Sequence, residues 1–291
     1  MATNPGDVTL AKVSIQLIAL LANIALALLK FTVGSIANSR ALIADAFNSA
    51  GDVLATFVAW LAFRYGLKPP DEDHHYGHQN AEAMAGLLLG GVLCATGAFI
   101  CIDGVLGLQD KLAPEGPGQI AMYAAAATAI VKEVLFQVSI REGRRSNSPT
   151  LLASARDHRA DVVSSLVALA GIFIARMGYP QFDAIAGILI GVYILYLSYE
   201  PVRDNTAILM QAAPPDIAPK AAQIAREIEG IRDVNQVRVQ PLGGSYRMDM
   251  SVQVNGKLTV DEAHGLAHTA EAQILAQLSN VTEVYVHVEP G

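Results

Sequence analysis

The chain is poor in charged residues. Lys, Arg, Asp and Glu make up only 16% of its 291 residues, whereas a soluble protein usually carries about 25%. The formal net charge of −7 is modest, and the sequence shows no basic patch of the kind that binds nucleic acid. This scarcity of charge argues against an ordinary soluble domain, and it predicts no nucleic-acid partner.

Cysteine and enzyme motifs are also scarce. The two cysteines, Cys94 and Cys101, are seven residues apart in one apolar segment. They share a helix face about two turns from each other, which disfavours a disulfide between them. The sequence has no nucleophile–base motif, phosphate-binding glycine loop or zinc-hydrolase signature. These absences predict that the protein is not an enzyme and has no cofactor.

Apolar residues are abundant, at 52% of the chain with a mean hydropathy of +0.36. They form six segments, each with room for the ~20 residues that cross a bilayer. These segments cover roughly residues 11–33, 39–64, 81–107, 117–140, 149–176 and 182–202. The second and fifth are long and polar at one end, so they are recognised by pattern as much as by hydropathy. The sequence therefore predicts a membrane protein with six transmembrane helices, embedded in lipid.

The distribution of Lys and Arg predicts its orientation. With the N-terminus inside, the inner segments hold Lys12, Arg64, Lys68, Arg141, Arg144, Arg145 and Arg203. The outer loops hold Arg40, Lys111 and Arg176. We therefore expect a multi-pass protein of the inner (plasma) membrane with both termini in the cytoplasm.

The character of the sequence changes after residue 207. Pro214-Pro215 breaks the chain, and Ile217 to Ile228 then shows helical spacing. Three predicted strands, around 234–239, 246–254 and 284–288, flank a second predicted helix over 259–278. The pattern predicts a transmembrane domain over 1–207 and an αββαβ cytoplasmic domain over 208–291. A unit of this size is small, and dimerisation would help it to form a core.

Two short segments place oxygen-bearing side chains inside predicted spans. Asn48 and Asp52 are four residues apart in the second span, and Asp157 and Asp161 are four apart in the fifth. On a helix this spacing puts each pair on one face. A carboxylate within a membrane helix costs roughly 2.5–3.5 kcal/mol by insertion scales, so it usually faces a partner, a cavity or an ion path. The two pairs can therefore form one four-ligand metal site.

Several motifs in order resemble the cation diffusion facilitator family of divalent-metal/proton antiporters, also known as the zinc transporter family. They are ALIADAFNSAGD, DEDHHYGHQNAEA, DHRADVVSS and a terminal VHVEP, together with the six spans. The resemblance covers nearly the whole chain. It implies a homodimer whose cytoplasmic domain has a ferredoxin-like (metallochaperone-like) α/β fold, and export of a divalent cation from the cytoplasm.

The resemblance also identifies Asn48, Asp52, Asp157 and Asp161 as the transport site. Many zinc-transporting members have histidine where this chain has Asp157, and the set here consists entirely of oxygen donors. Zinc sites generally recruit nitrogen or sulfur, and oxygen sets suit harder ions such as manganese. We therefore favour Mn²⁺ as the substrate, with Fe²⁺ next and Zn²⁺, Co²⁺ or Cd²⁺ behind. A rotated helix could instead present His158 as a nitrogen ligand.

Two further groups, both near the second span, are candidates for metal chemistry. Asp45 lies on nearly the same helix face as Asn48, and we expect it to support the site rather than ligate the ion. The resemblance matches Asp71, His74 and His78 to loop positions that bind metal in some members, and a solvated loop without metal is an equal alternative. These loop ligands include nitrogen, so zinc could bind there while manganese is transported.

The cytoplasmic domain carries a remnant of another family site. His264, His287 and Glu289 match three positions of a two-metal cluster that zinc-regulated members hold at the subunit interface. Two further histidine positions are occupied here by Arg238 and Ser251, and an arginine disfavours a nearby cation. We therefore expect one weak metal site per subunit or none.

The expected mechanism is proton-coupled antiport by alternating access. Three crowded carboxylates should take up protons when metal is absent, and metal binding displaces protons. The alternative outside transport is a membrane metal sensor or scaffold that binds without moving its ion. Ligands at all four core positions favour transport over this alternative.

Overall fold

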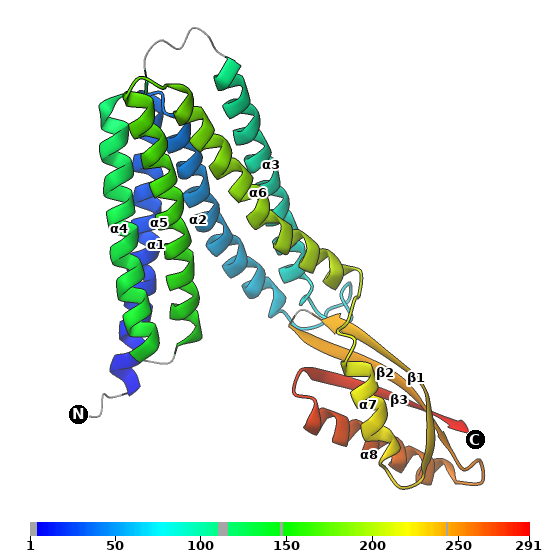
Figure 1. Ribbon diagram of the computed structural model, residues 1–291. Coiled ribbons are helices and arrows are strands. Elements are labelled where there is room, and N and C mark those ends of the chain that lie inside the picture. Colours follow the sequence, from blue (N-terminus) through cyan, green and yellow to red (C-terminus); the bar gives the residue numbers. More distant parts are fainter. Residues whose placement is uncertain (1–4, 110–115, 146–147, 243) are drawn as a thin grey trace. The chain divides into compact units, whose positions relative to one another are not determined.

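The computed structural model describes residues 5–109, 116–145, 148–242 and 244–291, so Lys111 lies outside the described residues (Figure 1). Six long helices come first. They are α1 (Pro5–Ile36), α2 (Arg40–Gly66), α3 (Ala81–Gln109), α4 (Gln119–Arg145), α5 (Pro149–Arg176) and α6 (Gln181–Leu209). All six are long and apolar enough to cross a membrane, which confirms the predicted six spans. Helices α2, α3 and α5 match their predicted limits within two residues, whereas α1, α4 and α6 run several residues past a predicted limit, because helical backbone continues into the polar turns beyond the apolar stretch.

The chain divides into two compact units, which are described separately. The first comprises residues 1–58 and 89–200, and the second residues 59–88 and 201–291. The core of the first unit is rich in alanine, including Ala41, Ala125 and Ala168, all 0% exposed. Small side chains allow close helix packing without a hydrophobic driving force between the helices. Large apolar side chains such as Phe99 and Tyr196 instead face outward, as lipid-facing positions require.

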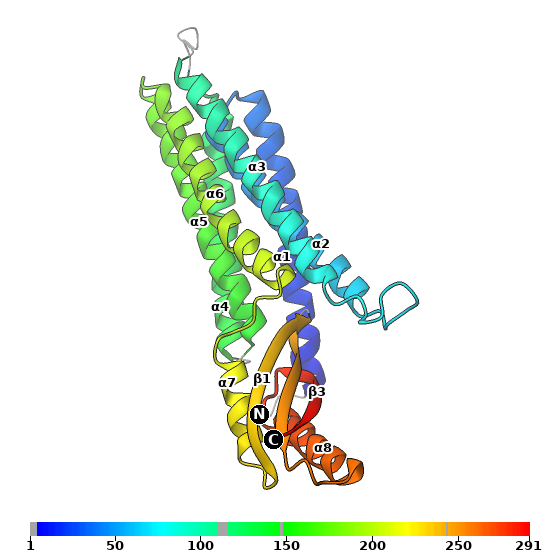
Figure 2. The same cartoon turned by 90° about the vertical axis from the view of Figure 1, so that its right-hand side faces the viewer.

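Glycine brings α3 and α6 together within the first unit. A Cβ on Gly97 would lie 2.9 Å from the carbonyl oxygen of Gly191, and one on Gly104 would lie 2.4 Å from Cγ1 of Ile188. Both distances are too short for a real side chain, so the two helices touch backbone to backbone here. The close approach follows the pattern of small residues at membrane helix contacts, and the two helices lie side by side in both views (Figures 1 and 2).

The N-terminus of α2 is capped from α6. Ser39 Oγ donates to Asp183 Oδ1 at 2.7 Å, and the backbone N–H of Arg40 donates to Asp183 Oδ2 at 2.6 Å. The first amides of a helix lack intrahelical acceptors, and a carboxylate also complements the positive end of the helix dipole. This cap fixes the start of the helix that carries Asn48 and Asp52.

The second unit contains the cytoplasmic-type domain. Its elements are α7 (Ile217–Arg226), β1 (Ile231–Leu242), β2 (Ser245–Val254), α8 (Val260–Gln277) and β3 (Val281–Pro290). The sheet order is β1-β2-β3, with β1 antiparallel and β3 parallel to β2. Helices α7 and α8 share one apolar core with the sheet. The predicted αββαβ order is confirmed.

Residue pattern explains the sheet and the helix that covers it. Met248, Met250 and Val252 alternate with outward residues along β2 and are at most 3% exposed. Helix α8 begins with a capping box in which Thr259 Oγ1 accepts from the backbone N–H of Glu262 and the Glu262 carboxylate accepts from the backbone N–H of Thr259. Both interactions satisfy amides that the first helical turn leaves open.

Candidate metal transport site

The two predicted ligand pairs meet in the interior of the helix bundle. Asn48 on α2 is 5% exposed and Asp161 on α5 is 5% exposed. The Asn48 amide Nδ2 donates to Asp161 Oδ1 at 3.0 Å. Because Asn48 and Asp161 come from different helices, this bond joins the two motifs directly.

Asp52 and Asp157 belong to the same cluster. Asp52 interacts electrostatically with Asp161 and Asp157, and its buried Oδ2 has no hydrogen-bond partner. Asp157 also interacts with Asp161 but is exposed, so it lies at the open edge of the cluster. An unpartnered buried carboxylate oxygen is costly, and it provides a free lone pair for a cation. The structure thus brings the two pairs together through the Asn48–Asp161 contact, although among the described residues the ligand atoms of the three aspartates do not all lie within 4.8 Å of one another.

Lys132 of α4 reaches this cluster and was not predicted to do so. Its Nζ forms an ion pair with Asp161 Oδ2 at 2.5 Å, and the lysine side chain is 0% exposed. The neighbouring Glu133 points elsewhere and pairs with Arg159 Nη1 at 2.9 Å. The sequence places Lys132 within a span, where a charged residue needs a partner. That signal predicts a carboxylate partner but does not say which one.

Two more side chains border the cluster. Tyr193 of α6 interacts electrostatically with all three aspartates. His158 is 4% exposed, and neither of its ring nitrogens has a hydrogen-bond partner. It interacts electrostatically with Lys132 and Asp161. Helix α5 therefore buries His158 more deeply than Asp157.

Asp45 lies in a separate, saturated network. Lys30 Nζ of α1 binds its Oδ2 at 2.7 Å, and Ser164 Oγ and Ser165 Oγ of α5 each donate to the carboxylate at 2.8 Å. Lys30 also donates to Ser49 Oγ at 2.8 Å. The network ties α1, α2 and α5 together next to the ligand pairs. Its geometry is that of a support for the site, because the oxygens of Asp45 already have donors.

The loop residues Asp71, His74 and His78 form a compact cluster in the second unit. Each of the three offers one ligand atom, and these atoms all lie within 4.8 Å of one another. Among the described residues, no other group of three His, Cys, Asp or Glu side chains meets this criterion. Asp71 Oδ1 lies 3.1 Å from His74 Nδ1, and Asp71 Oδ2 lies 3.3 Å from His78 Nε2. The backbone N–H of His74 donates to Asp71 and lowers the pKa of this carboxyl. Two imidazoles and an anionic carboxylate form a set that zinc prefers.

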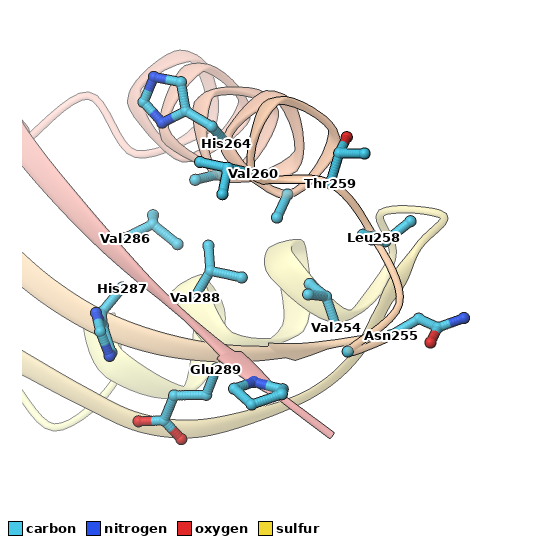
Figure 3. Close-up of a pocket in the computed structure, with 14 residues that line it drawn as sticks. Val254, Asn255, Leu258, Thr259, Val260, His264, Val286, His287, Val288 and Glu289 are labelled. Atoms are coloured by element: carbon cyan, nitrogen blue, oxygen red, sulfur yellow. The ribbon is translucent and has the colours of Figure 1, made fainter.

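The three cytoplasmic candidates are not grouped in the same way. Strand alternation turns Val286 and Val288 towards α8 and sends His287 and Glu289 to the opposite side (Figure 3). His264 projects from α8, and its Nε2 lies 3.0 Å from His268 Nε2. All three residues line a cavity of about 400 Å³, but in Figure 3 the His264 side chain points away from the other two.

Glu289 is occupied by neighbouring donors. Ser251 Oγ donates to its Oε1 at 2.5 Å and Asn235 Nδ2 donates to its Oε2 at 2.6 Å. These hydrogen bonds lower the pKa of Glu289. Ser251, one of the two residues that replace a family histidine, therefore satisfies this carboxylate instead of adding a metal ligand.

Comparison with known proteins identifies the family of the chain. Residues 16–210 match the cation efflux transmembrane domain, and residues 213–291 match the cation efflux protein cytoplasmic domain. The chain belongs to the cation efflux family. Members of this family are divalent-metal transporters, and this cation efflux protein is accordingly a multi-pass membrane protein with a C-terminal ferredoxin-like domain.

Individual relatives include proteins named for manganese. The cation efflux protein is 30% identical over 284 residues to manganese efflux system protein MneP of Bacillus subtilis, covering 95% of each chain. It is 28% identical over 262 residues to magnetosome protein MamB of a Magnetospira species, covering 90% of this chain and 89% of the relative. A solved structure of MamM CTD is 20% identical over 26% of this chain and 94% of its own, with a TM-score of 0.25.

Proposed function

We propose that this protein exports Mn²⁺ from the cytoplasm across the inner (plasma) membrane, in exchange for protons and by alternating access. The observation that carries the proposal is the buried hydrogen bond that joins Asn48 of α2 to Asp161 of α5. Asp52 and Asp157 lie one helical turn from these residues, and the predicted ligand set offers a cation oxygen donors alone. Hard oxygen donors suit Mn²⁺. Relatives named as manganese efflux proteins support the same substrate.

The residues of the site have distinct roles in this proposal. Asp52 offers a buried oxygen without a donor, so it can bind the cation without giving up a hydrogen bond at that oxygen. Asp161 and Asn48 must exchange their mutual hydrogen bond for contacts to the ion. Asp157, at the exposed edge, completes the set. Protons return on the same carboxylates when the ion leaves.

The direct test is reconstituted flux. Liposomes that contain the purified protein are loaded with Mn²⁺, Fe²⁺, Zn²⁺ or Cd²⁺ in parallel experiments, and Asp52→Asn is the inactive control. We expect Mn²⁺ to move fastest, with Fe²⁺ second. Tight metal binding without any flux would support the membrane sensor or scaffold instead.

The burial of His158 supports a second candidate, a Zn²⁺ exporter of the same family. Its two ring nitrogens have no partners beside the cluster, and zinc prefers such a ligand. The two candidates differ in which neighbour they require. Under manganese export, Asp157→Asn should abolish flux and His158→Ala should preserve it, and under zinc export the result should be reversed.

We also propose that the Asp71, His74 and His78 cluster binds a divalent ion of zinc type, separately from the transported ion. The compact geometry of its three ligand atoms supports this. Zn²⁺ calorimetry on the whole protein should lose one binding event in His74→Ala, while His75→Ala, outside the cluster, should retain it. Loss of no event in His74→Ala would leave the segment as a solvated loop.

For assembly, we propose a homodimer with both termini in the cytoplasm and a domain boundary near residue 207. The match to the family's cytoplasmic domain supports a dimer, and the excess of Lys and Arg in the inner segments supports the orientation. Light scattering of the purified protein tests whether it is a dimer. Labelling of single terminal cysteines in sealed vesicles tests on which side of the membrane the termini lie.

A further inference from the structure

Both oxygens of Asp161 face N–H donors. Asn48 Nδ2 lies 3.0 Å from Oδ1, and Lys132 Nζ lies 2.5 Å from Oδ2. The lysine and aspartate side chains are 0% and 6% exposed. A cation that uses Asp161 as a ligand therefore has to take the place of at least one of these donors.

The two donors are not equivalent. An amide can turn its carbonyl oxygen towards a cation, whereas an ammonium has three donors and no lone pair. Lys132 therefore cannot become a ligand, and its charge repels a divalent ion at short range. Lysine is also a compact charge on a flexible stem, so its Nζ can withdraw from Oδ2 without a backbone shift.

A second buried lysine in the same bundle shows the contrast. Lys30 Nζ binds Asp45 Oδ2, the Asp45 backbone carbonyl and Ser49 Oγ. Among the described residues, the hydrogen bond of Lys132 Nζ is to Asp161 alone. Lys30 is thus held by several acceptors outside the ligand set, while Lys132 is held by one acceptor that belongs to it.

We propose that Lys132 is a tethered cation that competes with the transported metal for Asp161 and so sets the affinity of the site. The inference rests on the proposed transport at Asn48, Asp52, Asp157 and Asp161. In formal charges, the three aspartates and Lys132 leave two negative charges, which one divalent ion balances. A competitor built into the site weakens binding and, for the same reason, helps the ion to leave.

The experiment uses the purified full-length protein and MnCl₂, with Lys30→Gln as the matched control for loss of a buried lysine. Thermal unfolding is followed without Mn²⁺, and Mn²⁺ binding is measured by calorimetric titration, in which the binding that Asp161→Asn removes is assigned to the transport site. Lys132→Gln should unfold at lower temperature without Mn²⁺ and should reach half saturation with Mn²⁺ at a concentration at least about tenfold lower than the unmodified protein. Lys30→Gln should also unfold at lower temperature, but it should not lower the half-saturating concentration, because Lys30 does not bind a residue of the ligand set.

Flux in liposomes gives a second measurement that a purely structural role would not move. Lys132→Gln should lower the KM for Mn²⁺ and also lower kcat, because tighter binding slows release. Lys132→Arg, which keeps the charge, should retain the original KM. If Lys132→Gln does not fold, Lys132→Met of similar volume is judged by the same criterion.

An unchanged or raised half-saturating concentration in the uncharged variant would overturn the proposal and leave Lys132 as a structural tie. This outcome can be told apart from failure of the proposed function. If the proposed function failed, the unmodified protein itself would neither bind nor move Mn²⁺.

Discussion

Asp157 distinguishes this site from the zinc-type pattern, because an oxygen donor stands where zinc-transporting members have a nitrogen donor. We predict that Asp157→His shifts selectivity from Mn²⁺ towards Zn²⁺, since it adds the borderline ligand that zinc prefers. The measurement is the ratio of Zn²⁺ to Mn²⁺ flux in liposomes, compared between the variant and the unmodified protein. Good Zn²⁺ flux and no Mn²⁺ flux in the unmodified protein would refute the ligand-hardness argument.

A pH-dependent prediction follows from Glu289. Its folded-state pKa is lowered by hydrogen bonds from Ser251 and Asn235, so the stability it contributes is present above its unfolded pKa and is lost as the pH falls through the lower folded pKa. Ser251→Ala should therefore destabilise the cytoplasmic domain at pH 7 and should do so less below about pH 4, near the ordinary carboxyl range. Thermal unfolding at both pH values tests this, and an equal loss at both would assign the effect to packing.

At this scale, sequence reasoning identified the four proposed transport ligands but not what surrounds them. The i,i+4 spacing places Asn48 with Asp52 and Asp157 with Asp161, and the structure joins the two pairs through the hydrogen bond between Asn48 and Asp161. The partner of Lys132 could not be predicted, because it depends on the rotation of α4 against α5, which periodicity within one helix does not specify. The side of the sheet that His287 and Glu289 occupy could be predicted from the sequence, because strand alternation sends every second residue of β3 to the same side.

Among the elements, α8 offers the cleanest test of local sequence logic. We predict that Thr259→Ala weakens its first turn by about 1 kcal/mol, because the capping box loses the side-chain acceptor for the Glu262 amide. Hydrogen exchange of that amide in the whole protein should become several-fold faster. Thr269→Ala, in the middle of the same helix, is the control and should leave this amide unchanged.

The positions of elements were more predictable than their ends. Six apolar segments each became a helix, and the alternating residues of β2 became a strand with Met248 and Met250 inside. The ends of α4 at Arg145 and of α6 at Leu209 lie past the predicted limits, because hydropathy marks the apolar stretch, whereas hydrogen bonding determines where a helix or strand stops. The cap on α2 by Asp183 could not have been foreseen, since the two residues that meet, Arg40 and Asp183, are far apart in the sequence.

On the scale of the whole molecule, coupling to protons is the central prediction. Adding Mn²⁺ to one side of proteoliposomes should change the lumenal pH, because metal and protons use the same carboxylates. The change should vanish in Asp52→Asn and in Asp161→Asn, which keep shape but lose a titratable group. A metal flux that ignores an imposed pH gradient would indicate a channel or uniporter.

Assembly gives the second prediction at this scale. Deleting residues 208–291 should impair dimer formation, measured by light scattering, because the cytoplasmic domain is expected to hold the subunits together. Changing His264 and His287 to Ala should lower transport only modestly, since the structure does not group them with Glu289. Calorimetry on the purified protein is the check, and two tight cytoplasmic sites per subunit that these changes remove would restore a regulatory metal cluster.

The saturated network around Asp45 has a mechanical consequence. One buried carboxylate binds side chains from α1 and α5 while it is itself part of α2. Pulling these helices apart would strand a charge in an apolar interior, which is far costlier than sliding apolar surfaces. We therefore expect the helices that carry the proposed ligands to move as one block. Under the alternating access proposed above, the ligand spacing should then stay constant while the route to it changes.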